Sequence, residues 1–159
     1  MLRTTLLSLA AAAMLAFTAA PSFAGPAETA FLQKLSNTWS GRGTLKGAET
    51  GPIACKVVIT AGSKSTKFQG RCNIPDMAQQ AFSGSISYND KTKRYESRTG
   101  SGVVPGVRKG DRLVFTTSNK SIAGTSRSVM TISPSSLVID FALTTSKGEK
   151  TTSRITFSR

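Results

Sequence analysis

The side chains that could carry out chemistry are few in this chain of 159 residues. It has no histidine, which excludes a Ser-His-Asp triad, a Cys-His dyad, and a histidine-ligated zinc or haem. Only eight residues are acidic, and most stand at predicted turns, so we expect no carboxylate pair for general acid–base catalysis. Serine and threonine are abundant, and a Ser-Lys pair stays open as an alternative. We therefore expect no enzyme activity, no cofactor and no metal site.

The two cysteines can be placed by counting. If residues 53–61 and 66–73 form a tight hairpin, counting back from its turn puts Cys55 directly opposite Cys72. Such a pair occupies a non-hydrogen-bonded position, where the Cα atoms lie about 4.5 Å apart, near the short end of disulfide geometry. We predict a structural disulfide. The alternative, a redox-active pair, lacks the C-x-x-C spacing and the helix N-terminus that would lower a thiol pKa.

The first 24 residues have the layout of a secretory signal peptide. Arg3 supplies a positive charge, residues 6–17 form an apolar run, and Ser22 and Ala24 are small residues before a cleavage site. As a helix, this run is about 18 Å long, too short for a bilayer core of about 30 Å. We predict cleavage after Ala24 and a periplasmic destination, with secretion as the alternative.

Residues 25–159 are expected to form a single domain made largely of strands. Only residues 27–37 have the pattern of a helix. Turn residues divide the remainder into short segments. The predicted strands are 39–46, 53–61, 66–73, 81–88, 92–99, 102–108, 111–117, 125–132, 136–145 and 150–158. Ten short, evenly spaced strands in one small domain indicate an antiparallel sandwich or a closed barrel.

The strands alternate between apolar and polar residues. Leu137, Ile139 and Phe141, for example, share one face of their strand, and Asp140 stands on the other. Such strands have one dry face and one wet face. A transmembrane barrel would instead turn its apolar face to lipid and carry girdles of aromatic residues. We therefore expect a protein that does not span a membrane.

The two ends of the chain resemble those of calycin-type barrels: the lipocalins, fatty-acid-binding proteins and nitrobindin-like proteins. The residues that carry this resemblance are Phe31, Leu32, Leu35, Trp39, Gly41, Gly43 and Leu45, together with the closing segment 152–159. The resemblance implies an all-β fold, an antiparallel up-and-down barrel of eight to ten strands with a short N-terminal helix. The pattern also resembles that of small exported proteins of alphaproteobacteria.

In calycin-type barrels a basic residue near the last strand commonly packs on the tryptophan of the first strand. The resemblance therefore implies a barrel-closure contact at Trp39. Arg159 is the first candidate for its basic partner, and Arg154, whose position in the strand points outward, is the second. Haem binding by nitrobindin-like proteins does not carry over, because it uses a histidine and this chain has none.

The charge is strongly positive. Without Arg3, 20 basic and 8 acidic residues remain, a net charge of +12. The basic residues concentrate in one stretch: Lys91, Lys93, Arg94, Arg98, Arg108, Lys109 and Arg112. This stretch is either a solvated face that favours solubility or a site for an anionic lipid, lipopolysaccharide or an acidic glycan. Nucleic acid would match the positive charge. It is not expected in the predicted compartment, however, and the chain has few aromatic residues on which bases could stack.

Taken together, these features predict a non-catalytic, exported binding protein. Its ligand would be a small apolar or amphipathic molecule inside the barrel, or an anionic component of the cell envelope on the basic face. The alternative is a structural or interaction protein of the envelope, with a filled barrel and no small ligand.

Overall fold

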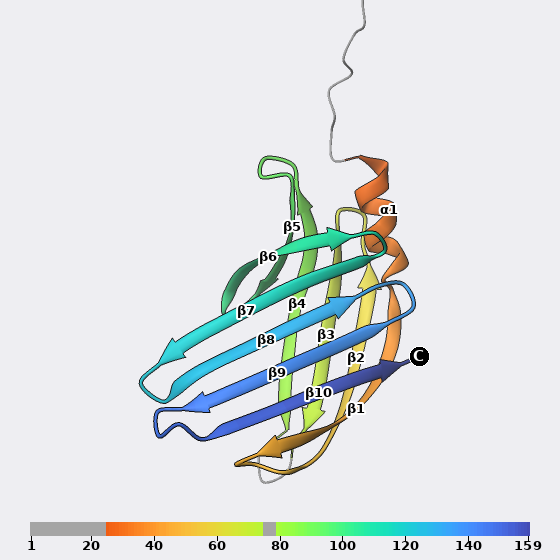
Figure 1. Ribbon diagram of the computed structural model, residues 1–159. Coiled ribbons are helices and arrows are strands. Elements are labelled where there is room, and N and C mark those ends of the chain that lie inside the picture. Colours follow the sequence, from red (N-terminus) through yellow and green to blue (C-terminus); the bar gives the residue numbers. More distant parts are fainter. Residues whose placement is uncertain (1–24, 75–78) are drawn as a thin grey trace, which may run out of the picture.

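The computed structural model describes residues 25–74 and 79–159, which form one helix and ten strands (Figure 1). The predicted signal peptide, residues 1–24, lies outside the described residues. The elements are α1 (Pro26–Lys34), β1 (Asn37–Gly47), β2 (Gly51–Ala61), β3 (Ser65–Asn73), β4 (Gln80–Asn89), β5 (Arg94–Thr99), β6 (Gly102–Lys109), β7 (Arg112–Ser121), β8 (Gly124–Ile132), β9 (Leu137–Thr145) and β10 (Lys150–Ser158). Within the described ranges, no helix is long and apolar enough to cross a membrane.

The ten strands close into an antiparallel barrel of the up-and-down type. Each strand pairs with its neighbours in sequence, and β1 pairs with β10, with Gly43 opposite Ile155. The predicted all-β barrel with an N-terminal helix is therefore confirmed, at the upper end of the predicted range of eight to ten strands. All ten predicted strands are present, with ends that shift by at most a few residues.

The most deeply buried part of the core lies at the end of the barrel next to α1. Leu113, Ile132, Leu137 and Phe157 follow one another across β7 to β10, each directly opposite the next. All four side chains are at most 5% exposed. Because successive residues of a strand point to opposite faces, this row fixes which residues of each strand point inward.

Helix α1 covers this end of the barrel with a small apolar face. Phe31, Leu32 and Leu35 are buried. The helix is shorter than the predicted 27–37, because the amides of Leu35 and Ser36 bond to carbonyls three residues back and the chain then turns into β1. The hydroxyl of Thr66 donates a hydrogen bond of 2.8 Å to the Leu32 carbonyl, which ties the helix to β3.

Four phenylalanine rings on the inner wall lie over glycines of the adjacent strand. A Cβ atom added to any of these glycines would stand 2.4–2.6 Å from the ring opposite. The pairs are Gly41–Phe157, Gly70–Phe82, Gly84–Phe68 and Gly106–Phe115, each directly opposite in register. Aromatic rings that cover cross-strand glycines fix the register and keep the strand pair packed.

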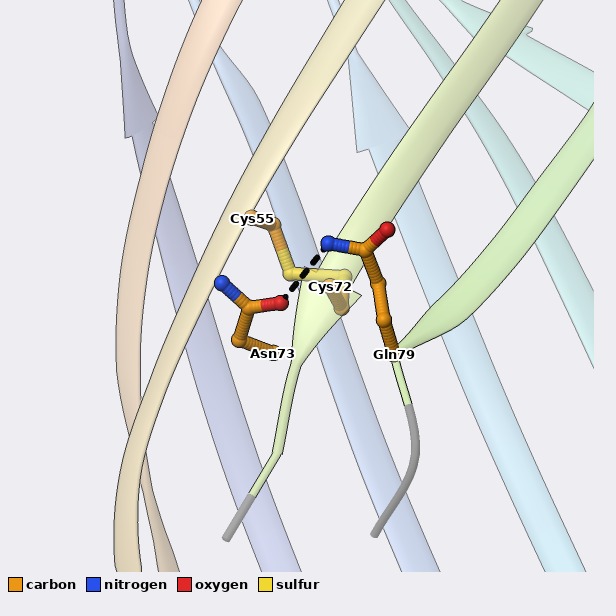
Figure 2. Close-up of a disulfide and its surroundings, with 4 residues drawn as sticks. All are labelled: Cys55, Cys72, Asn73 and Gln79. Atoms are coloured by element: carbon orange, nitrogen blue, oxygen red, sulfur yellow. Dashed lines mark hydrogen bonds between the residues drawn. A yellow bond between two sulfur atoms is a disulfide. The ribbon is translucent and has the colours of Figure 1, made fainter.

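A disulfide joins β2 to β3 at the end of the barrel away from α1 (Figure 2). Cys55 and Cys72 are directly opposite in register, with Cα atoms 4.1 Å apart. Beyond the bond, the side-chain amide of Gln79 donates a hydrogen bond of 3.0 Å to Asn73. The predicted hairpin register and disulfide are both confirmed.

The C-terminal residue, Arg159, reaches Trp39 of the first strand. This indole is 1% exposed, and the guanidinium carbon of Arg159 lies 5.6 Å from the centroid of its ring. Arg154 points to the outer face, where it forms an ion pair of 3.3 Å with Asp140 of β9. Arg159, and not Arg154, is therefore the residue that contacts the indole.

Candidate functional site

The inner wall of β7 to β10 changes from apolar to hydroxyl-bearing residues with increasing distance from α1. In the row next to Leu113, Ile132, Leu137 and Phe157, the residues Phe115, Met130, Ile139 and Ile155 are also apolar. In the two rows farther from α1, five inward residues carry hydroxyl groups. This hydroxyl wall consists of Thr117, Ser126, Ser128, Thr151 and Ser153. On β7 to β10, the half of the wall away from the helix thus carries hydroxyl groups, whereas the two rows nearer the helix are apolar.

Ser153 is the most informative member of the hydroxyl wall. It is 7% exposed, and its Oγ has no hydrogen-bond partner among the described residues. A buried polar group left without a partner costs about 1–3 kcal/mol. Trp39 Nε1, nearer to α1, is the other buried side-chain atom without a partner in the described part of the chain. Each is a point at which a polar group inside the barrel could bind.

Apolar side chains stand beside these hydroxyls. Phe141 lies directly opposite Ser128 on one side and Ser153 on the other. Phe141, Leu143 and Phe82 are only half-buried although they point inward. Their exposed surface therefore faces the interior or its mouth. The wall combines exposed apolar surface with hydroxyl groups, which is the chemistry of a site for an amphipathic molecule.

The predicted anion-binding residues are distributed over three strands and a turn. Lys91 and Lys93 lie in the turn between β4 and β5, and Arg94 and Arg98 lie on the outer face of β5. Lys109 and Arg112 are directly opposite each other where β6 turns into β7. All of these residues are exposed.

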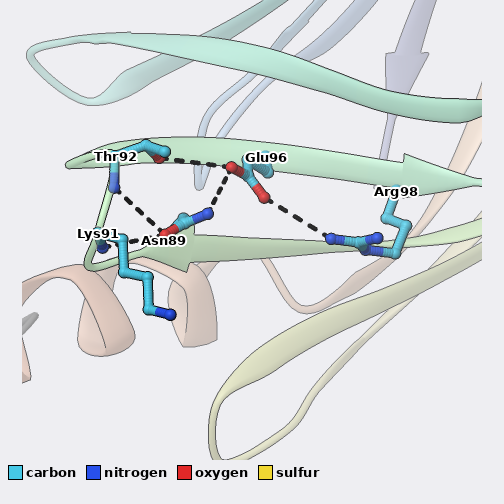
Figure 3. A network of polar contacts seen from close by, with 5 residues as sticks. All are labelled: Asn89, Lys91, Thr92, Glu96 and Arg98. Carbon is cyan, nitrogen blue, oxygen red and sulfur yellow. Dashed lines mark hydrogen bonds and ion pairs between the residues drawn. The ribbon is translucent and has the colours of Figure 1, made fainter.

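A polar network holds the turn between β4 and β5 (Figure 3). The Asn89 side-chain oxygen accepts bonds from the amides of Lys91 and Thr92, and its nitrogen donates a bond of 2.7 Å to Glu96. Glu96 also pairs with Arg98 at 3.8 Å. Arg98 thus has an acidic partner on its own strand, and Lys91 contributes to the network through its backbone amide.

The structure separates Arg108 from the other predicted anion-binding residues. It shares the inward side of β6 with Gly106 and reaches the barrel end under α1, where its guanidinium carbon lies 4.0 Å from the centroid of Phe31. Its Nη1 donates a hydrogen bond of 3.2 Å to the Tyr95 hydroxyl. Burial raises the pKa of Tyr95, and the bond from Arg108 opposes this, so the hydroxyl stays neutral at neutral pH. Arg108 therefore helps to hold the helix on the barrel.

Replacing Arg108 with alanine is expected to lower the free energy of unfolding by about 1–2 kcal/mol, because the cation–π contact and the bond to Tyr95 are both lost. Arg112→Ala is the matched control, with an expected change within about 0.5 kcal/mol, because Arg112 makes no cation–π contact or ion pair among the described residues. Urea unfolding of the two variants measures the difference. Equal losses would contradict the role of Arg108 in holding α1.

Sequence reasoning missed two features of the surface and the wall. The first is the exposure of Val103 and Val107, at 44% and 59%, on the outer face of β6. Their alternation with Val104 and Gly106 indicates that the two valines share one face of the strand, but it does not tell whether that face points inward or outward. The second is the unpartnered hydroxyl of Ser153, which depends on its neighbours in space.

Comparisons with known proteins agree with the barrel fold. No protein-family model matches the chain, and no curated protein sequence matches it significantly. Among solved structures, the chain is similar to that of Rv2717c from M. tuberculosis, with a TM-score of 0.54 and 15% sequence identity. The match covers 85% of this chain and 99% of that chain. At this identity, the similarity supports the barrel fold alone.

Proposed function

We propose that this protein is a non-catalytic binding protein that holds a small amphipathic molecule in the half of its barrel away from α1. The observation that carries the proposal is the buried, unpartnered Oγ of Ser153 beside the half-buried ring of Phe141. A ligand with an apolar body and a polar group would cover the ring and supply the missing hydrogen bond. A ten-stranded barrel is wider than an eight-stranded one, whose interior is filled by side chains or by one small ligand. This extra width also favours a site inside the barrel.

The distribution of charge supports a role without catalysis. In the ranges that the structure describes, no carboxylate occupies an inward position of a strand: Glu96 and Asp140 lie on the outer face, and other acidic residues lie in turns or in α1. General acid–base chemistry in the interior would need such a group. The disulfide and the N-terminal segment 1–24 favour export to the periplasm, where disulfides persist.

A fluorescent amphiphile tests the proposal directly. The wild-type protein is expected to bind 1-anilinonaphthalene-8-sulfonate with a rise in emission. Thr117→Phe should weaken this binding at least about 10-fold, because Thr117 points inward opposite Ser128 and a ring there would occupy the ligand's space. Thr116→Phe is the matched control, since its exposed side chain lies on the outer face of the same strand.

The outcomes separate the proposal from its alternative. Weaker binding by Thr117→Phe, with wild-type binding by Thr116→Phe, supports a site inside the barrel. Equal effects of the two substitutions would place the probe on the outer surface and overturn the proposal. A wild-type protein that binds no probe would favour the alternative, a structural protein of the envelope with a filled barrel.

A further inference from the structure

The outer face of β6 carries an exposed apolar strip. Val103 and Val107 are 44% and 59% exposed, two of the three exposed large hydrophobic residues in the described part of the chain. Exposed Pro105 lies between them, and Val114 of β7 stands directly opposite Val107. We call Val103, Pro105, Val107 and Val114 the apolar strip. The apolar strip runs along the strand, so a single flat surface could contact all four residues.

Cations flank the apolar strip at both ends, while Glu96, which pairs with Arg98, lies directly opposite Pro105. Arg98 is directly opposite Val103, and Arg94 stands one residue before the pair formed by Tyr95 and Gly106. At the other edge, Lys109 and Arg112 are directly opposite each other. Like charges in this arrangement destabilise a sheet, and neither residue has an acidic partner within 4 Å among the described residues. An anion bound at this edge would remove the repulsion.

We infer that this face docks on an anionic lipid bilayer, with the apolar strip at the level of the headgroups. Arg94, Lys109 and Arg112, here called the rim cations, would contact lipid phosphates. Interfacial binding grows with apolar area and with attraction to anionic lipids, and each basic residue near such a surface adds to it. The net charge of +12 that remains after the predicted cleavage draws the protein toward the same surface.

A nucleic acid fits this face less well. It would pair with the rim cations but would leave the apolar strip in water. Single strands also need aromatic rings on which bases stack. The nearest such rings, Tyr88 and Tyr95, contact each other on the inner side of the wall, with centroids 5.0 Å apart. A bilayer uses both the cations and the strip, and this docking does not depend on the ligand proposed for the interior.

Sedimentation with vesicles tests the role of the rim cations. The probe is phosphatidylglycerol mixed with phosphatidylcholine, at about 0.15 M salt. Arg94→Glu/Lys109→Glu/Arg112→Glu is expected to reduce the partition coefficient about 100-fold. The control Arg42→Glu/Lys46→Glu/Lys150→Glu makes the same change in charge at exposed residues of β1 and β10, across the barrel. It should reduce partitioning less than about 10-fold. Equal losses would show attraction by net charge alone and overturn the inference.

A second pair of variants tests the apolar strip. Val103→Ser/Val107→Ser should weaken vesicle binding about 10-fold or more, because less apolar area enters the interface. Ile122→Ser, at a fully exposed residue of the turn between β7 and β8, should leave binding unchanged. Thermal unfolding checks that each variant is folded. Unchanged binding by the valine variant, or tighter binding of the wild type to single-stranded DNA than to these vesicles, would overturn the inference.

Discussion

Replacing Trp39 with alanine is expected to lower the free energy of unfolding by about 3–5 kcal/mol, the cost of removing a large buried ring. The side chain is 1% exposed and stands on the first strand, next to the closure of the barrel. Trp39→Phe should cost less, because it keeps an aromatic ring and also removes the unpartnered Nε1. Urea unfolding of the oxidised protein measures both changes.

A double-mutant cycle tests the contact between Trp39 and Arg159. Arg159→Ala alone should cost about 0.5–2 kcal/mol, the value of a cation–π contact. Because the guanidinium lies 5.6 Å from the centroid of the Trp39 ring, the losses from Arg159→Ala and Trp39→Ala should not add. Strict additivity would show that the two residues do not interact in solution.

Removal of the disulfide is expected to have the second large effect. The bond spans a sequence separation of 17 residues, and closing a loop of about this length contributes about 3 kcal/mol in the chain-entropy model. Cys55→Ala/Cys72→Ala should therefore lower the free energy of unfolding by about 3 kcal/mol or slightly more, because the two buried sulfur atoms are also lost.

The reduced wild-type protein is the control for this variant. The structure contains no free cysteine, so a reductant acts on this bond alone. Reduction should shift the urea midpoint nearly as far as the double substitution does. Peptide mapping without reductant should recover Cys55 joined to Cys72. If both thiols were free in the folded, exported protein, the structural role of the bond would be contradicted.

Most of the fold could be predicted from local patterns. Alternating apolar residues and turn residues identify all ten strands, because a strand with one buried face repeats every two residues. The tight turn between β2 and β3 sets their register, which was sufficient to pair Cys55 with Cys72. Closure of β1 on β10 is not a local property, and the expectation came from the resemblance of the chain ends to calycin-type barrels. The structure shows the closure, while membership of that family stays a hypothesis.

The candidate sites were less predictable because they depend on contacts between distant segments. Arg108 belongs to a basic stretch of the sequence, yet it stacks on Phe31 because α1 covers that end of the barrel. The unpartnered hydroxyl of Ser153 results from its neighbours on β1 and β9. The exposure of Val103 and Val107 follows from the inward orientation of Gly106, which the barrel as a whole determines.

Native mass spectrometry of the protein purified from its own host tests the central claim, a ligand inside the barrel, most directly. The expected result is a chain that begins at Gly25 and carries one small molecule in a fixed ratio. That added mass should be lost in Thr117→Phe and kept in Thr116→Phe. Wild-type protein of bare mass, or an added mass that both variants retain equally, would contradict the proposed site inside the barrel.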